Sequence, residues 1–188
     1  MRSLVVLVVE NNLHEQEMLA QILAGFRVKR TDRCGTAAEA MEHLGRDRAD
    51  LVMVGAAFPD GDGTAFIERM RRTKAMASRE VPVLLLAGHM RLADVCKARD
   101  CGANWVLVRP VTPVALYNRI AWLAKNERPF VETETYVGPD RRFKHEGPPA
   151  GTNGRRKDDL SLDVGEATTS NMSQADIDAL LNGKGPAR

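Results

Sequence analysis

The sequence has few aromatic residues, few cysteines and little net charge. Aromatic residues make up 5% of the 188 residues, so aliphatic side chains must supply most of any hydrophobic core. The three cysteines, Cys34, Cys96 and Cys101, lack the Cys-x-x-Cys spacing of zinc and redox sites, and their odd number argues against a disulfide framework. Lys and Arg number 27 against 25 Asp and Glu, a balance that does not predict a DNA-binding protein.

Long hydrophobic runs are also missing. The apolar run at residues 4–9 is far shorter than the roughly 20 residues that span a bilayer. It also lacks the length and the small-residue cleavage site of a signal peptide. We therefore expect a cytoplasmic protein with no membrane partner.

Composition changes sharply near residue 128. Aliphatic runs crowd the first two thirds of the chain, whereas Gly, Pro, Asp, Lys, Arg, Ser and Thr dominate the last third. Such a segment cannot bury enough apolar surface to offset its chain entropy. We predict one domain over residues 1–128, a disordered linker over 129–170, a short amphipathic helix over 171–183 and a disordered end over 184–188.

Strand and helix patterns alternate strictly through the predicted domain. Short β-branched or aliphatic runs predict five strands, at residues 4–9, 26–30, 51–54, 81–86 and 105–108. Helical patterns come after them at residues 13–23, after Thr36, at 64–72, at 92–99 and after Thr112-Pro113. This alternation predicts an α/β fold with a parallel sheet covered by five helices, and a functional crevice at the carboxyl ends of the strands.

Several landmarks in order resemble the CheY-like receiver domains of two-component signalling. The resemblance covers about residues 4–126, and the sequences that carry it are Val8-Val9-Glu10-Asn11-Asn12, Asp50-Leu51-Val52, Pro59 with Asp62-Gly63, Val81-Pro82-Val83, and Gly102-Ala103-Asn104 leading to Val108-Arg109-Pro110. The resemblance implies a flavodoxin-like doubly wound sheet with strand order 2-1-3-4-5.

The family's phosphorylation chemistry needs five positions, and this sequence departs at four of them. An acidic pair holds Mg²⁺, an aspartate accepts the phosphoryl group, and a Ser or Thr and a Lys contact its oxygens. The resemblance places these roles on Glu10, Asn11, Gly55, Ala87 and Arg109. Because Gly55 has no side chain, we expect a degenerate pocket, no enzymatic activity and no Mg²⁺ or other cofactor.

This degeneracy has two consequences for the pocket. Asp60 and Asp62 lie in the turn beyond the third strand, where we do not expect either to replace the missing nucleophile. We hypothesise that the guanidinium of Arg109 pairs with Glu10 and stands in for metal and phosphate. The alternative is that both side chains reach solvent.

Without a nucleophile, the domain is expected to bind proteins independently of phosphorylation. The resemblance implies a partner face on the fourth helix, fifth strand and fifth helix, which would include Met90, Arg91, Val106, Val108, Leu116, Tyr117 and Arg119. The leading hypothesis is therefore a response-regulator-like adaptor. The other interpretation is a conventional phosphorelay regulator with a displaced phosphoryl acceptor. Gly55 argues against it, because glycine has no side chain that could accept a phosphoryl group.

The last helical pattern is well defined. Ser173 and Asp176 resemble a capping box, with Asp in place of the usual Glu. Met172 and Ile177 have hydrophobic-staple spacing, and Ile177, Leu180 and Leu181 make an apolar stripe. The segment, including Gln174, is similar to the N-terminal CheY-binding peptide of the flagellar switch protein FliM. It implies a role in chemotaxis or flagellar control, with the peptide docking on its own domain or on another receiver.

Paired arginines in the predicted linker leave one alternative open. Arg141-Arg142 and Arg155-Arg156 could grip the phosphates of cyclic di-GMP and stack on its guanines. Neighbouring Asp158 and Asp159 neutralise the second pair locally. The alternative function is therefore a CheY-like cyclic di-GMP effector, and the plain interpretation is solvated linker charge.

Overall fold

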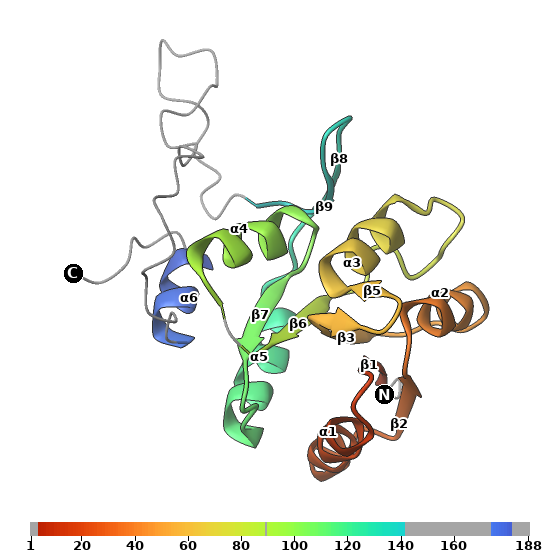
Figure 1. The fold of residues 1–188 in the computed structure, drawn as a ribbon, viewed down its shortest axis with the longest axis vertical. Coiled ribbons are helices and arrows are strands. Elements are labelled where there is room, and N and C mark those ends of the chain that lie inside the picture. The colour runs from red at the N-terminus through yellow and green to blue at the C-terminus, as the bar shows by residue number, and fades with distance from the viewer. Residues whose placement is uncertain (1–3, 89, 142–173, 182–188) are drawn as a thin grey trace.

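A five-stranded parallel sheet forms the centre of the molecule (Figure 1). The computed structural model describes residues 4–88, 90–141 and 174–181. The main sheet has the order β2-β1-β3-β6-β7. Its strands are β1 (Val5–Val9), β2 (Arg30–Cys34), β3 (Leu51–Gly55), β6 (Val83–Ala87) and β7 (Trp105–Val108). This order is the flavodoxin-like one that the sequence predicted.

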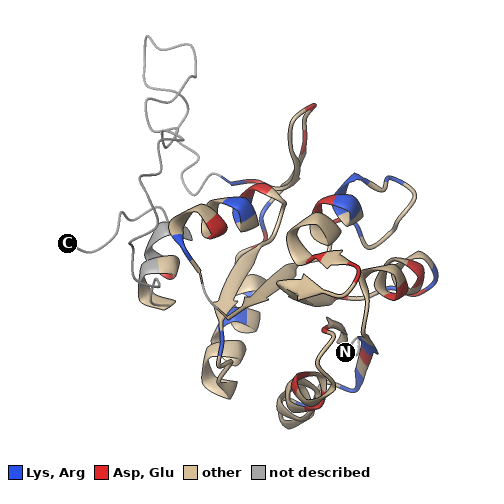
Figure 2. Cartoon of the chain, viewed as in Figure 1, with Lys and Arg blue, Asp and Glu red and all other residues tan. Residues whose placement is uncertain are grey.

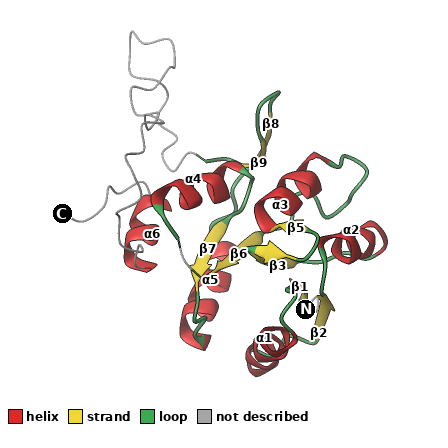
Figure 3. Cartoon of the chain, in the orientation of Figure 1, coloured by secondary structure: helices red, strands yellow, loops and turns green. Residues whose placement is uncertain are grey.

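Helices cover both faces of this sheet (Figure 3). The helices are α1 (Leu13–Gly25), α2 (Ala37–Arg46), α3 (Gly63–Arg72), α4 (Leu92–Asp100), α5 (Pro113–Lys125) and α6 (Gln174–Leu181). In Figure 1, α1 and α5 lie on one face, and α2, α3 and α4 lie on the other. Burial follows this layering, because every residue of β3 and β6 is buried.

The helix starts follow from local hydrogen bonding. The side chain of Asn12 accepts from the backbone N–H groups of His14 and Glu15 at the start of α1. Thr36 Oγ1 accepts from the Glu39 N–H (3.2 Å), and Thr112 Oγ1 caps α5, which begins at Pro113. The predicted caps at Thr36 and Thr112 are therefore confirmed.

The predicted second strand was placed too early. Phe26 caps the end of α1, and residues 26–29 form a turn in which Arg27 has a positive φ of 64°. The strand is the polar run Arg30–Cys34 instead, whose pattern of exposure suits an edge strand open to solvent on one side. The apolar Phe26 and Val28 still pack on the core, but they do so from the turn.

Two small hairpins supplement the main sheet. β4 (Ala57–Phe58) and β5 (Gly61–Asp62) pair within the turn after β3. β8 (Phe130–Glu132) and β9 (Val137–Pro139) pair directly after α5. The expectation of a disordered linker from residue 129 is therefore wrong over 129–141, and residues 142–173 lie outside the described part of the chain.

Charged residues are spread over the helices (Figure 2). Both acidic and basic side chains occur on α2, α3 and α4, and the edge strand β7 carries neither. None of the helices in the described ranges is long and apolar enough to cross a membrane.

Candidate functional site

Four of the five predicted pocket residues meet at the carboxyl ends of the central strands. Glu10 comes directly after β1, Gly55 ends β3, Ala87 ends β6 and Arg109 comes directly after β7. Parallel strands place their carboxyl ends at one edge of the sheet, which explains why residues so distant in sequence converge. Asn11, the fifth residue, is exposed.

A three-residue ion cluster occupies the middle of this edge. Arg109 Nη2 donates to Oε2 of Glu10, and Arg109 Nη1 contacts Oε2 of Glu15. The Glu10 side chain is only 2% exposed, and its second oxygen accepts from the backbone N–H of Asn12 (3.1 Å). The predicted pairing of Arg109 with Glu10 is confirmed.

Glu15 was not foreseen as part of the site. It lies in the first turn of α1, just beyond the loop after β1. Its position five residues after Glu10 could have predicted this. A helix that begins just after a strand places its first turn close to the end of that strand. Its carboxylate gives Arg109 a second anionic partner.

Gly55 makes room for this ion cluster. A Cβ atom at position 55 would overlap Oε2 of Glu10 and would lie 3.2 Å from its carboxyl carbon. The same atom would lie 3.4 Å from Nη2 of Arg109. The Glu10–Arg109 pair therefore fills the space that a side chain at position 55 would need.

Gly63 is the second close approach at this edge. A Cβ atom there would overlap the carbonyl oxygen of Gly55 and would lie 3.2 Å from Cα of Ala56. The backbone N–H of Gly63 donates to the carbonyl of Ala56 (3.0 Å). The start of α3 is thus held directly against the end of β3.

The edge strand β7 carries a second site, formed with the tail helix α6. Gln174 bridges the backbone of β7: its Oε1 accepts from the Val108 N–H (2.8 Å), and its Nε2 donates to the Val106 carbonyl (3.3 Å). Figure 1 shows α6 on the open side of β7. The amide thus pairs with backbone groups of the sheet edge, which would otherwise have no neighbouring strand.

One turn further along α6, Asp178 makes the charged contacts. Its Oδ1 accepts from the indole Nε1 of Trp105 (3.3 Å), and its Oδ2 pairs with Nη2 of Arg119 on α5. The Arg119 guanidinium also lies over the Trp105 ring, 4.5 Å from its centroid. Ile177, between these polar contacts, is fully buried and belongs to the hydrophobic core.

We call Trp105, Val106, Val108 and Arg119 the β7–α5 surface. It shares Val106, Val108 and Arg119 with the partner face expected from the sequence, and it adds Trp105. Of the other expected residues, Met90 is buried in the core and Arg91 pairs with Asp94 at the start of α4. Leu116 is buried in the core, and Tyr117 packs edge-on against Phe26, with ring centroids 5.5 Å apart, which turns it toward α1. Tyr117 was therefore wrongly assigned to this face.

The predicted tail contacts are described only in part. Gln174 and Ile177 contact the domain as stated above. Met172 and Ser173 lie outside the described residues, and so do the side chains of Asp176, Leu180 and Leu181. Asp178, which the sequence pattern did not single out, contacts Trp105, Arg119 and Gln174.

Arg141, a candidate nucleotide ligand, is already engaged within the domain. Its Nη1 pairs with Asp100 (2.6 Å), and its guanidinium lies 4.1 Å from the ring centroid of Tyr136. The Tyr136 hydroxyl in turn donates to the Pro139 carbonyl (2.6 Å). Arg142, Arg155 and Arg156 lie outside the described residues.

Comparison with known proteins identifies the domain. Residues 6–121 match the family model of the response regulator receiver domain, which is more than half of the chain. The chain belongs to the receiver-domain family. Among solved structures, it resembles the signal receiver domain of a histidine kinase from Syntrophus aciditrophicus, at 26% identity and a TM-score of 0.58 over 70% of this chain and 98% of that one. The chain also resembles the chemotaxis protein CheY4 of Vibrio cholerae, with a TM-score of 0.59 and 19% identity over 64% of this chain and 98% of that one.

Curated relatives are longer proteins. The transcriptional regulatory protein BasR of Escherichia coli is 33% identical over 57% of this chain and 46% of its own length. The transcriptional regulatory protein PmrA of Pectobacterium parmentieri is 30% identical over 65% of this chain and 53% of its own length. A protein-glutamate methylesterase/protein-glutamine glutaminase of Anaeromyxobacter dehalogenans is 33% identical over 58% of this chain and 30% of its own length. This chain thus spans about half, or less, of these relatives.

As a receiver domain, the chain would be expected to hold Mg²⁺ beside a phosphoacceptor, but its residues do not fit that ion. Mg²⁺ requires several oxygen ligands, usually carboxylates and water. The two carboxylates at this edge, Glu10 and Glu15, both contact the Arg109 cation. In the described part of the chain, no group of three or more His, Cys, Asp or Glu side chains is arranged to hold a metal.

The two aspartates that come after β3 in this receiver domain are committed to helix starts. Asp60 accepts from the backbone N–H groups of Ala37 (3.2 Å) and Ala38 (3.1 Å), and these hydrogen bonds lower its pKa. Asp62 Oδ1 caps α3 by accepting from the Thr64 N–H (2.7 Å). Both carboxylates thus bind backbone N–H groups at helix starts.

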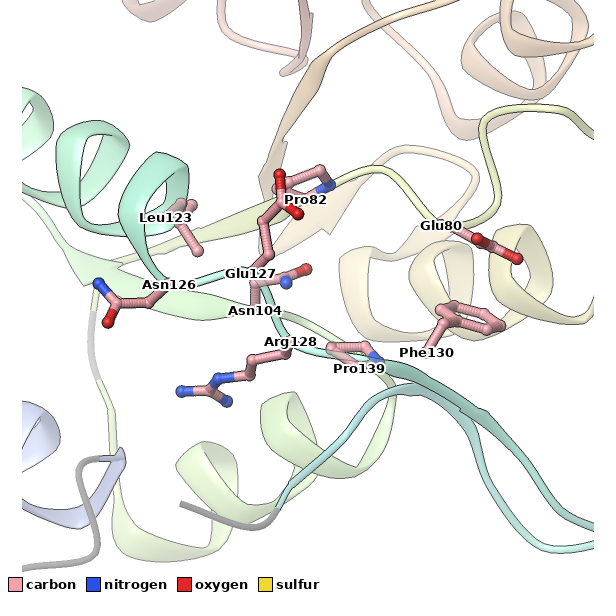
Figure 4. A pocket seen from close by; sticks show the side chains of 9 residues that line it. All are labelled: Glu80, Pro82, Asn104, Leu123, Asn126, Glu127, Arg128, Phe130 and Pro139. Atoms are coloured by element: carbon pink, nitrogen blue, oxygen red, sulfur yellow. The ribbon is translucent and has the colours of Figure 1, made fainter. Parts of the chain in front are cut away.

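A pocket of about 240 Å³ lies at the opposite end of the sheet (Figure 4). Its lining comes from the segments before β6 and β7, the end of α5 and the β8–β9 hairpin, namely Glu80, Pro82, Asn104, Leu123, Asn126, Glu127, Arg128, Phe130 and Pro139. It is therefore the space between the receiver core and the hairpin, remote from Glu10 and Arg109.

Proposed function

We propose that this chain is a response-regulator-like signalling protein of a two-component system that works without phosphorylation. In this proposal it is a cytoplasmic protein-interaction adaptor in chemotaxis or flagellar-motor control. The observation that carries it is the Glu10–Arg109 pair beside Gly55, because the position of the phosphoryl acceptor has no side chain and a guanidinium stands next to it.

The electrostatics of the pair support a fixed, unswitched domain. In a phosphorylatable receiver, Mg²⁺ and the phosphoryl group bring opposite charges to this edge and redistribute contacts there. Here Arg109 supplies one permanent positive charge to two carboxylates, and Glu10 is too buried to exchange it readily for water. The cluster thus holds the carboxyl ends of β1 and β7 and the first turn of α1 together.

The partner side of the proposal rests on α6 and on its resemblance to the FliM peptide. Proposed partners are a component of the flagellar switch, another receiver domain, or a component of the histidine-kinase pathway. Some curated relatives are transcriptional regulators, but the described elements of this chain beyond α5 are the β8–β9 hairpin and α6. Arg141 does not favour the cyclic di-GMP alternative, because Asp100 and Tyr136 already engage it.

An NMR titration with Mg²⁺ and beryllofluoride, the analogue of an aspartyl phosphate, tests the absence of the switch. We expect no saturable shift of the backbone amides at Gly55, Ala87 and Arg109 in the full chain. A phosphorylatable receiver domain serves as the control, in which the corresponding amides shift. Saturable shifts in this chain would refute the proposal.

Swimming behaviour tests the biological part. Deletion of the gene is expected to change the frequency of swimming reversals, and the wild-type gene should restore it, as should a Cys96→Ser variant that leaves both sites intact. Normal swimming after deletion, together with altered transcription, would assign the chain to gene regulation instead.

A further inference from the structure

The described contacts between α6 and the domain combine specific polar pairs with one buried apolar side chain. Gln174 pairs with two backbone groups of β7, and Asp178 binds an indole and a guanidinium. Only one of the described α6 side chains, Ile177, is fully buried. An eight-residue helix is marginally stable alone in water, so α6 depends on this surface for its structure.

We propose that α6 is a displaceable resident of the β7–α5 surface, and that a helix of the same chemistry from a partner protein binds there in its place. The partner helix would present an amide at one position, an aliphatic side chain three residues after the amide, and a carboxylate four residues after the amide. This rests on the proposed function, in which the same surface serves partners. It adds that the chain regulates access to that surface itself.

The surface selects this chemistry through its own backbone groups. The Val108 N–H needs an acceptor and the Val106 carbonyl needs a donor, and a Gln side chain supplies both from one planar group. A Glu in its place would leave the carbonyl without a donor. The amide position therefore discriminates between uncharged and charged side chains of the same length.

The carboxylate position is selected by two donors that are fixed relative to each other. Arg119 stacks over the ring of Trp105, so the guanidinium and the indole N–H are held side by side. Asp178 accepts from both. In addition, Gln174 Nε2 donates to Asp178 Oδ1 (2.7 Å), so the amide and the carboxylate reach the surface as one connected unit.

Residence in the same chain makes α6 a strong competitor. A tethered segment acts at an effective concentration on the order of 1 mM. For an intrinsic dissociation constant of roughly 10–100 µM, such a competitor weakens the apparent affinity of a free helix by about 10- to 100-fold. A partner must therefore bind more tightly than α6, or occur at high local concentration, as repeated subunits of a large assembly do.

The test measures binding of a fluorescently labelled peptide with the sequence of residues 171–183 to the full-length protein. A protein variant carrying Gln174→Ala and Asp178→Ala releases its own helix. We expect the peptide to bind this variant at least 10-fold more tightly than it binds wild type. Ala175→Ser, at an exposed position of α6, is the matched control and should behave as wild type.

Two further samples locate the binding. Adding Arg119→Ala to the released variant should abolish peptide binding, and a peptide with Ala at both the Gln and Asp positions should not bind. Equal affinity of wild type and released variant would overturn the proposal. Failure of the released variant to bind the peptide, while its receiver domain still unfolds cooperatively in urea, would also overturn it.

The Trp105 indole resonance reports directly on the resident helix. In wild type its chemical shift should be independent of protein concentration and should move on release by Gln174→Ala and Asp178→Ala. A concentration-dependent shift with dimer formation would mean that the helix comes from a second copy, which contradicts intramolecular residence. These outcomes are separable from the proposed function, because a beryllofluoride response can be measured on the same wild-type sample without any peptide.

Discussion

Arg109 Nη2 donates to Glu10 Oε2 directly beside the Cα of Gly55, in the volume that a side chain at position 55 would enter. The arginine at position 109 and the glycine at position 55 are thus sterically coupled through Glu10. The longer, forked guanidinium reaches two carboxylates, and it can do so because position 55 is empty. A side chain at position 55 would therefore displace the Glu10–Arg109 pair.

Removing the cation should be costly for folding. Arg109→Ala leaves the Glu10 carboxylate buried at 2% exposure without its partner, and breaking such a pair typically costs about 3–5 kcal/mol. We expect a loss of about 3 kcal/mol in the free energy of unfolding, measured by urea denaturation. Glu10→Gln combined with Arg109→Ala should recover part of it, because no buried charge remains.

Arg33→Ala is the matched control for this loss. Arg33 pairs with Glu17 at 2.7 Å, but both side chains are about half exposed, so its removal should change stability by less than about 1 kcal/mol. Equal losses in the free energy of unfolding for Arg33→Ala and Arg109→Ala would mean that the Glu10–Arg109 pair stabilises the protein no more than an exposed ion pair does.

Restoring the aspartate alone should not restore the chemistry. In Gly55→Asp the Cβ overlaps Glu10 Oε2, and we expect destabilisation of about 1–3 kcal/mol without Mg²⁺ binding. Adding Arg109→Lys and Asn11→Asp frees Glu10 and supplies a second acid, so Mg²⁺ binding should appear only in the triple variant. Calorimetric titration with Mg²⁺ measures this. Mg²⁺ binding by Gly55→Asp alone would show that Arg109 does not block the site.

The buried Arg71 should prove more important than its position on a helix suggests. It is fully buried and donates to the carbonyls of Gly102 (3.1 Å) and Val81 (2.8 Å) and to Asn104 Oδ1 (2.9 Å). Arg71→Met removes the side-chain donor from the two buried carbonyls, while Asn104 Oδ1 keeps the Val83 N–H (2.9 Å), and it should cost about 2–4 kcal/mol in urea denaturation. The neighbouring Arg72→Met removes only an exposed pair with Glu68 and should cost less than about 0.5 kcal/mol. Similar losses in the two variants would rule out this bracing role.

Thiol reactivity should single out one cysteine. Burial raises the pKa of Cys34 to about 11 and that of Cys101 to about 12, so at pH 8 their reactive thiolate forms are scarce. Cys96 is only partly buried. A chromogenic thiol reagent at pH 8 should therefore modify one cysteine rapidly in native protein, and none in Cys96→Ser. Three rapid equivalents in native protein would show that the core is open.

The sequence predicted the sheet well because its central strands are unambiguous. The runs that became β1 and β3 are continuous and apolar, which is typical of strands buried on both faces. β2 was misplaced because an edge strand keeps polar residues, and the apolar Phe26 and Val28 nearby form a turn that also packs on the core. Strand order came from the family resemblance, since periodicity contains no such information.

The residues of the Glu10–Arg109 site could be predicted from the sequence, but most of the contacts around them could not. Glu10, Gly55 and Arg109 follow from motif positions, but Glu15 and the buried Arg71 have ordinary helical sequence contexts. The β8–β9 hairpin was missed because Gly138 and Pro139 are typical of linkers. In the structure Gly138 instead lets the chain pass close to Gly102, where a Cβ would approach Gly102 Cα at 2.9 Å. The register of α6 on β7 depends on a side-chain-to-backbone bridge, which no local pattern encodes.

Labelling with radioactive acetyl phosphate in the presence of Mg²⁺ tests the central claim most directly. The full chain should incorporate no hydroxylamine-labile phosphate under conditions that label a phosphorylatable receiver domain, because no carboxylate stands at position 55 to attack phosphorus. Stoichiometric, hydroxylamine-labile incorporation that maps to this edge of the sheet would contradict the claim.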